Sequence, residues 1–150
     1  MQVWRIAKKN RALDRTGVGA SLKGGRWNSQ NVPAIYAGMT PEIAAFEKLV
    51  HTGPFLPDDL VLVRISLPDD ASLYESPKTL PKGWDTLPSS PVAAAMGDEF
   101  IAKGKKLGLI VPSAVMPEAK NIVINPNHPR IVDVGMEIVR QFVFDPRLRP

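Results

Sequence analysis

The 150-residue sequence contains no cysteine and only two histidines, His51 and His128. A disulfide framework, a thiol nucleophile and a structural zinc cluster are therefore excluded or nearly so, and any catalysis must use other side chains. The chain also lacks a run of 18 uncharged apolar residues, and its first residues lack the apolar segment of a signal peptide. These absences predict a cytoplasmic protein with no membrane association.

The composition is that of an ordinary globular protein, with 44% hydrophobic and 23% charged residues. A chain of this length suits one hydrophobic core, so we expect a single domain over residues 1–150. The formal charge of +4 favours an acidic partner or a phosphate-bearing ligand. The basic clusters at 8–11 and 103–106 are short and hold no interleaved aromatic residue, so direct nucleic-acid binding is not expected.

Fifteen prolines and eleven glycines divide the chain into short elements. This pattern predicts an α+β fold, with mixed or antiparallel sheets of short strands and flanking helices. The apolar run at 60–67 is the clearest strand, and we expect it to be central. Other expected strands or strand-like pieces are 2–7, 26–28 paired with 34–37, 109–111, 121–125 and a last one containing Val139, Phe142 and Phe144.

Two helices are expected. Thr40 can cap a helix, proline suits the first helical position and Glu42 suits the positive end of the dipole, so a helix should run from there to about His51. A second helix is expected over 92–106. A proline-rich connection, 76–91, precedes the second helix, and a glycine-rich loop is expected at 17–25.

Three side chains stand out as candidates for chemistry. Arg26 follows two glycines, which let a backbone approach a ligand while the guanidinium binds phosphate or carboxylate, although composition alone favours a surface arginine beside a turn. Tyr36 could stack on a planar heterocycle, although a tyrosine in a strand is more often a core residue. Glu47 falls at the margin of a helical apolar stripe, where it could face a cleft or pair at the surface with Lys48 or His51.

Two further candidates lie where strands give way to loops. Ser113 directly follows a proline that ends a strand, and Asn125 directly precedes another proline. Ordinary turn chemistry also explains both residues. Ser113 has no serine-hydrolase setting, because the sequence lacks the nucleophile-elbow pattern.

Together these residues resemble the RES domain, a family named for its arginine, glutamate and serine. The resemblance covers residues 4–129 and depends on the order and spacing of short motifs. The matching pieces are Gly25-Arg26-Trp27-Asn28, Tyr36, Glu47 in a helix, Val111-Pro112-Ser113-Ala114, and residues 121–126 followed by His128-Pro129.

The resemblance implies the toxin of a bacterial toxin–antitoxin pair, with a fold similar to mono-ADP-ribosyltransferases. Such a toxin cleaves the bond between nicotinamide and ribose, by hydrolysis or phosphorolysis, and so depletes cellular NAD. NAD is then a substrate, and neither a metal nor another cofactor is expected. The implied partner is an Xre-type antitoxin that covers the active site, with a toxin dimer inside the complex.

The site carried over from the family consists of Arg26, Tyr36, Glu47, Ser113 and Asn125. Glu47 would stabilise the oxocarbenium-like ribosyl cation, Arg26 would hold the pyrophosphate or a ribose hydroxyl, and Tyr36 would stack on nicotinamide. Ser113 and Asn125 would donate hydrogen bonds to the ribose or the carboxamide.

Some alternatives stay open on the sequence alone. Asn121 lies near Asn125 on the same face of its strand and is an alternative to it. A mono-ADP-ribosyltransferase that modifies a cellular protein would share every NAD contact, and a non-catalytic nucleotide-binding module would need no Glu47. Whether water, phosphate or a protein accepts the ribosyl group is not decided by the sequence.

Overall fold

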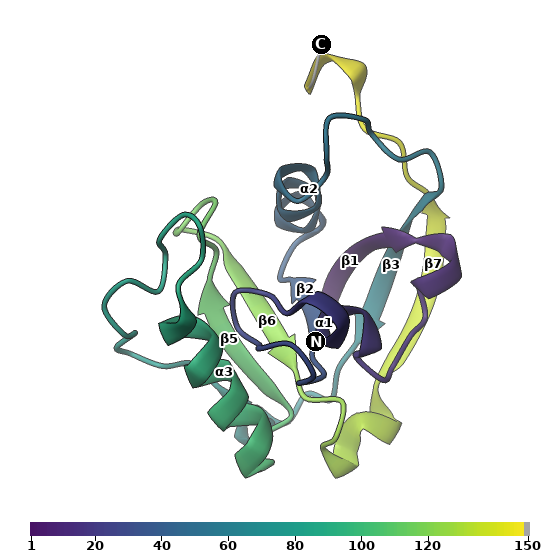
Figure 1. Cartoon of the computed structure of the whole chain (residues 1–150). Helices are drawn as coiled ribbons and strands as arrows, with labels where there is room; N and C mark the ends of the chain where they lie inside the picture. Colours follow the sequence, from purple (N-terminus) through teal and green to yellow (C-terminus); the bar gives the residue numbers. More distant parts are fainter. Residues whose placement is uncertain (149–150) are drawn as a thin grey trace.

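The computed structural model describes residues 1–148 and contains one seven-stranded mixed sheet (Figure 1). The spatial order of its strands is β4-β5-β6-β2-β1-β3-β7. Every neighbouring pair is antiparallel except β4 and β5. The strands are β1 (Gln2–Lys8), β2 (Ile35–Gly38), β3 (Leu60–Ser66), β4 (Tyr74–Glu75), β5 (Gly108–Pro112), β6 (Lys120–Ile124) and β7 (Gly135–Gln141). The predicted α+β class is confirmed; the last two residues of the expected domain lie outside the described part.

Three α-helices accompany the sheet: α1 (Val18–Lys23), α2 (Pro41–Val50) and α3 (Pro91–Lys103). The predicted start of α2 is confirmed, because the Thr40 hydroxyl oxygen accepts a hydrogen bond from the Ile43 amide at 3.3 Å. Glycine at 104, in the left-handed conformation with φ of 63°, ends α3. Within the described residues, no helix is long and apolar enough to cross a membrane.

Two expectations for the N-terminal third are wrong. The glycine-rich segment 17–25 is not only a loop, because α1 forms inside it. Residues 26–28 do not form a strand either; they belong to a tight turn closed by a bridge between Gly25 and Asn28. Glycine permits the turn to start, since Gly24 has a φ of 75°.

Two expectations about strands also need correction. The strand β3 is flanked by β1 and β7 and lies next to the edge of the sheet, so it is not central. The last strand, β7, ends at Gln141, before the two phenylalanines of the expected alternation. Phe142 and Phe144 instead make an edge-to-face pair, and Phe144 is buried against residues of β1 and β3. Their spacing reflects burial beyond the strand end.

The sheet opens between β1 and β2. The strand β1 pairs with β3 along its whole length, but it pairs with β2 only where Trp4 faces Gly38. Figure 1 shows the consequence: β5 and β6 lie with α3 on one side, β1, β3 and β7 lie on the other, and α1 lies between the two groups. This divergence leaves room for a pocket.

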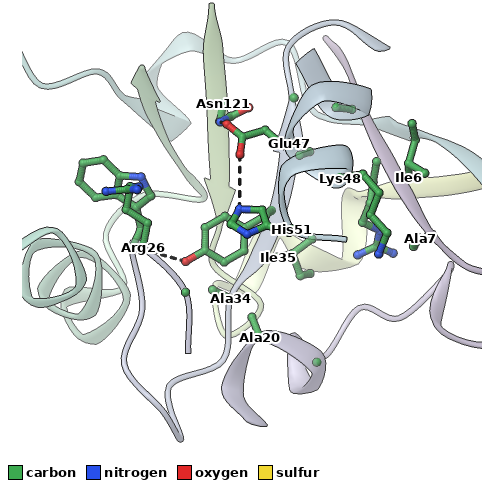
Figure 2. A pocket seen from close by; sticks show the side chains of 18 of the residues that line it. Ile6, Ala7, Ala20, Arg26, Ala34, Ile35, Glu47, Lys48, His51 and Asn121 are labelled. Atoms are coloured by element: carbon green, nitrogen blue, oxygen red, sulfur yellow. Dashed lines mark hydrogen bonds and ion pairs between the residues drawn. The ribbon is translucent and has the colours of Figure 1, made fainter. Parts of the chain in front are cut away.

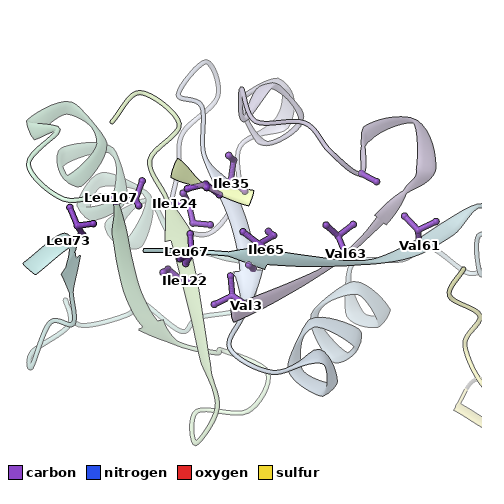
Figure 3. Close-up of a cluster of buried hydrophobic side chains, with 13 residues drawn as sticks. Val3, Ile35, Val61, Val63, Ile65, Leu67, Leu73, Leu107, Ile122 and Ile124 are labelled. Carbon is purple, nitrogen blue, oxygen red and sulfur yellow. The ribbon is translucent and has the colours of Figure 1, made fainter. Parts of the chain in front are cut away.

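Apolar side chains on one face of the sheet form the main core (Figure 3). Val3, Ile35, Val63, Ile65 and Ile122 are among its members and are at most 2% exposed. Each such side chain stabilises the folded state by about 1.5–3 kcal/mol relative to an exposed one. A second cluster, which includes Trp27, Phe100 and Leu109, packs α3 against the opposite face of β5 and β6.

The turn at 24–28 is tied to α3 through a close backbone contact. A Cβ atom added at Gly97 of α3 would lie 1.7 Å from the Trp27 carbonyl oxygen. Trp27 is itself only 3% exposed, and its ring stacks on that of Trp84 with 5.9 Å between centroids. Only glycine at position 97 therefore lets α3 press against this turn.

We expect Gly97→Ala to lower the free energy of unfolding by about 3 kcal/mol, the upper end of the cost of overpacking, because the new methyl group meets backbone atoms. Urea denaturation measures the change. Gly53→Ala is the matched control, since nothing lies within 4 Å of a Cβ there; its effect should stay within about 1 kcal/mol. Equal stabilities of the two variants would contradict the close contact.

Candidate active site

A pocket of about 550 Å³ occupies the opening between β1 and β2. This volume is in the usual range for sites that bind small molecules. Residues of α1, α2, the turn at 24–28 and the end of β5 complete its wall. Figure 2 shows Glu47 pointing toward Asn121 and His51, whereas Lys48 of the same helix points to the side of Ile6 and Ala7.

The Glu47 carboxylate, which reaches the pocket from α2, is held by side chains from two other parts of the chain. Its Oε1 atom accepts hydrogen bonds from the Ser113 hydroxyl at 2.6 Å and from the Asn121 side-chain amide at 2.7 Å. Its Oε2 atom lies 3.6 Å from Nε2 of His51, one helical turn later. The two oxygens thus have different surroundings: one is fixed by neutral donors and the other faces a histidine.

Glu47 is ionised under ordinary conditions. Burial disfavours its charged form and by itself raises its pKa. The nearby His51 and the hydrogen bonds from Ser113 and Asn121 favour the charged form and outweigh the burial, so the pKa of Glu47 lies below its ordinary value. A half-buried carboxylate is therefore kept negative without a lysine or arginine against it.

Ser113 acts on the pocket through Glu47. The residue is fully buried, directly after β5, and its side chain does not line the pocket. Its hydroxyl oxygen accepts hydrogen bonds from the amides of Val115 and Met116 at 3.0 and 3.2 Å, which leaves the proton for Glu47. The structure brings the predicted serine to the site, as a positioning residue and not as a wall residue.

Of the two asparagines of β6 and its end, the structure brings Asn121 to the pocket and not Asn125. Asn121 lines the pocket and bonds Glu47. Asn125 is fully buried, donates to the Ile101 carbonyl at 3.3 Å and accepts from the Asn127 amide at 2.9 Å. Its side chain joins the end of β6 to α3 and to the following turn, so we assign it a structural role here.

Tyr36 lines the pocket with its ring and holds the turn at 24–28 with its hydroxyl. The hydroxyl donates to Oδ1 of Asn28 at 2.6 Å and accepts from the Trp27 amide at 3.1 Å. Burial raises the pKa of Tyr36, so the phenol stays neutral. Asn28, almost fully buried, also donates to the carbonyls of Ala20 and Val32, which joins the turn to α1.

Arg26 lines the same pocket across from Glu47 (Figure 2). Its Nη1 atom donates to the carbonyls of Trp84 and Thr86 at 2.8 and 3.0 Å, so it also anchors the proline-rich segment 76–90. Nε and Nη2 have no hydrogen-bond partner within residues 1–148. The guanidinium therefore keeps donors for an anion.

Arg5 is a pocket residue that the sequence reasoning missed. It lies on β1, and Nη2 donates to the carbonyls of Ala12 and Asp14. Its Nε atom is buried without a hydrogen-bond partner among the described residues. Burial lowers the pKa of Arg5, and the charge of Asp14 offsets part of this effect. The missed signal was a charged residue two positions after buried Val3, on the core-facing side of the strand.

The arrangement combines the fixed Glu47 carboxylate with three arginines, Arg5, Arg11 and Arg26, in one cavity. The carboxylate can stabilise a positive charge that develops on a bound molecule, and the guanidiniums can bind phosphate groups in a bidentate manner. Within residues 1–148, no three His, Asp or Glu side chains come together as a metal site. Within the same residues, the Oδ1 atom of Asn121 and the Nε atom of Arg5 are both buried without a hydrogen-bond partner.

The sequence is similar to that of known proteins. A family profile described as "RES domain" matches residues 2–145. The chain is 36% identical to a "Prs ADP-ribosylating toxin" of Sphingobium sp. strain YBL2, with 97% of this chain and 94% of that protein covered. It is 31% identical to a "Toxin Res" of Yersinia enterocolitica, with 99% and 100% covered, and 34% identical to a "Toxin Res" of Pseudomonas putida, with 99% of each covered.

The fold is also similar to a solved structure. A chain in the crystal structure of the M. tuberculosis MbcT-MbcA toxin-antitoxin complex superimposes with a TM-score of 0.70 and 19% sequence identity. The match covers 99% of the present chain and 86% of the other. At this identity the likeness concerns the fold alone.

We expect Ser113→Ala to raise the pKa of Glu47, because the carboxylate loses a hydrogen bond while its burial remains. A lowered folded-state pKa stabilises the folded protein above the unfolded pKa, and this contribution is lost as the pH falls through the folded pKa. The variant should therefore lose less stability on acidification. Titration of the Glu47 carboxyl carbon by NMR measures the pKa.

The control for that titration is Ser72→Ala, which removes a hydroxyl from the exposed Asp70 at 2.6 Å, outside the pocket. This control should leave the Glu47 titration in place. An unchanged pKa of Glu47 in Ser113→Ala would mean that the serine does not hold the carboxylate in solution.

Proposed function

The chain belongs to the RES-domain family, and it is similar over almost its whole length to proteins named as toxins. We propose that it is the toxin of a bacterial toxin–antitoxin pair and that it cleaves the nicotinamide–ribose bond of NAD. The observation that carries the proposal is the fixed Glu47 carboxylate opposite Arg26 in one pocket of about 550 Å³. NAD is the substrate in this proposal, and its loss is what harms the cell.

Glu47 has one acceptor position left for a ribose hydroxyl. An ionised carboxylate offers about four lone-pair positions to donors. Ser113 and Asn121 use the two of Oε1, and His51 faces one of Oε2. A ribose bound at the remaining position would bring the negative charge beside C1′, where positive charge grows as nicotinamide leaves. The carboxylate would then stabilise the transition state more than the substrate.

The cationic side of the pocket suits the diphosphate. Arg26 has free Nε and Nη2 donors within the described part of the chain, and the buried Nε of Arg5 lacks a partner there. An unpaired buried donor costs about 1–3 kcal/mol, which a phosphate oxygen would offset. The ring of Tyr36, with its hydroxyl already bound to Asn28, would offer a fixed face for stacking on nicotinamide.

The acceptor of the ribosyl group defines a second candidate function. Water or phosphate as acceptor gives NAD hydrolysis or phosphorolysis, whereas a protein acceptor gives mono-ADP-ribosylation. The Sphingobium relative, at 36% identity, is named an ADP-ribosylating toxin, which favours the transfer reaction for that protein. Both reactions require the same NAD contacts, so the two proposals differ only after the nicotinamide bond has broken.

The proposed partner is an Xre-type antitoxin, with the toxin as a dimer inside the complex and the pair acting in the cytoplasm. The fold likeness to a chain of a toxin-antitoxin complex supports an antitoxin partner. The positive formal charge of +4 would favour an acidic segment of that partner at the pocket.

Intracellular NAD should fall when this chain is induced without an antitoxin. Arg26→Ala should abolish the fall because it removes the proposed diphosphate donor, and Glu47→Gln should slow it by about 100-fold or more because the transition-state charge is lost. Glu99→Gln is the matched control: Glu99 is exposed on α3 and pairs only with nearby Lys103 at 2.9 Å among the described residues. It should deplete NAD like the wild type.

Mass spectrometry of cellular proteins in the same cultures separates the two candidates. Suppose that ADP-ribose adducts form on cellular proteins, that Glu47→Gln prevents them and that NAD levels stay unchanged. The function would then be protein modification and not NAD depletion. Stable NAD, no adducts and normal growth would overturn both and favour a non-catalytic nucleotide-binding module.

A further inference from the structure

His51 occupies a position in the pocket that the proposed NAD contacts leave unused. It lines the pocket at the end of α2, with 76% of its side chain exposed. Its Nε2 atom lies 3.6 Å from Oε2 of Glu47, the oxygen that Ser113 and Asn121 do not contact. A histidine–carboxylate contact one helical turn apart, with the histidine exposed, contributes little to stability. The pair is of interest because both residues line the pocket.

We propose that His51 is the general base that takes the proton of the ribosyl acceptor, with Glu47 holding the opposite ring nitrogen. The inference rests on the proposed NAD cleavage and adds the acceptor side of that reaction. Nε2–H directed at Oε2 leaves Nδ1 as the nitrogen with a free lone pair. A carboxylate that orients an imidazole and stabilises its cationic form is an established way to make histidine a base.

The step balances without a further reagent. The bond between C1′ of the ribose and the pyridinium nitrogen breaks, and its electron pair leaves with nicotinamide, which becomes neutral. The oxygen of the acceptor, such as water, bonds to C1′, and its proton passes to His51 Nδ1. The imidazolium then returns the proton to solvent, with which the exposed ring is in contact.

Two features of the fold favour a positive charge on this ring during the step. His51 is the C-terminal cap residue of α2, where the helix dipole is negative. The carboxylate beside it stays ionised, since the pKa of Glu47 lies below its ordinary value. The Glu47 carboxylate would thus stabilise the ribosyl cation and also orient the histidine that takes the proton of the acceptor.

Other charged groups near α2 must be separated from His51 in a pH profile. The pocket is also lined by Arg5, Arg11 and Arg26 and by Asp14 and Lys23. Lys48 lies next to Glu47 on α2, with Lys8 and Asp59 as charged neighbours. Arginine keeps its charge over the working range. Burial raises the pKa of Asp14, but hydrogen bonds from Thr16 and Gly17 outweigh it and keep that pKa below its ordinary value. Lys48 is the lysine of the pocket for which burial lowers the pKa. Lys48→Arg, which keeps the charge, therefore accompanies the histidine variants.

The experiment measures nicotinamide release from NAD by the purified chain in water, from mildly acidic to mildly alkaline pH. The wild type should lose kcat on the acid side, where an imidazole is protonated. His51→Gln and His51→Ala should both lower kcat by about 100-fold at neutral pH, the lower end for general-base catalysis, with KM near that of the wild type and no acid limb. Lys48→Arg should keep the acid limb.

The His51→Gln variant distinguishes two roles of His51, that of a general base and that of a residue that only positions Glu47. The glutamine amide can donate a hydrogen bond to Glu47 but cannot take a proton. Recovery of wild-type kcat in His51→Gln would show that His51 only positions Glu47 and would overturn the proposal, as would an acid limb retained in both variants. Lys103→Gln, which breaks the similar Glu99 pair on α3, should behave as the wild type. If the wild type releases no nicotinamide, the proposed function fails first, and the role of His51 fails with it.

Discussion

The single pairing position between β1 and β2 is the constraint on which the pocket depends. Trp4 faces Gly38 there, while β1 follows β3 along its whole length and β2 follows β6. This one contact keeps the sheet continuous, so both parts of it share one core. Away from the contact, β1 and β2 diverge. Had β1 and β2 paired over their whole length, their backbones would fill the space that Arg5 and Tyr36 now line.

The groups that line this opening are held by the same contacts that hold the fold. The hydroxyl of Tyr36 binds the turn that carries Arg26, and that turn presses its Trp27 carbonyl on Gly97 of α3. Arg26 in turn fixes the segment 76–90 through two carbonyls. The fold and the proposed substrate site therefore share residues, so a variant of the turn must be tested for folding before its activity is interpreted.

Charge is distributed unevenly across the pocket. Neutral donors, Ser113 and Asn121, hold the Glu47 carboxylate on one side, and arginines stand on the other without touching it. A direct salt bridge between the two sides would neutralise both. Their separation leaves an anion and cations available to one ligand, which suits the proposed substrate, a dinucleotide with a cationic nicotinamide ring and an anionic diphosphate.

The local pattern of the sequence was enough to predict the α+β class, the capped helix α2 and the place of Glu47 beside an apolar stripe, because capping, strand composition and helical periodicity are properties of neighbouring residues. Arg26 and Tyr36 became candidates through the resemblance to the RES domain, since each also has an ordinary structural explanation. Contacts between distant segments were decided only by the tertiary structure. These include Asn121 in place of Asn125 at Glu47, the indirect role of Ser113, the pocket position of Arg5 and the place of β3 near the sheet edge. Strand order and the divergence of β1 from β2 set them, and neither depends on local sequence.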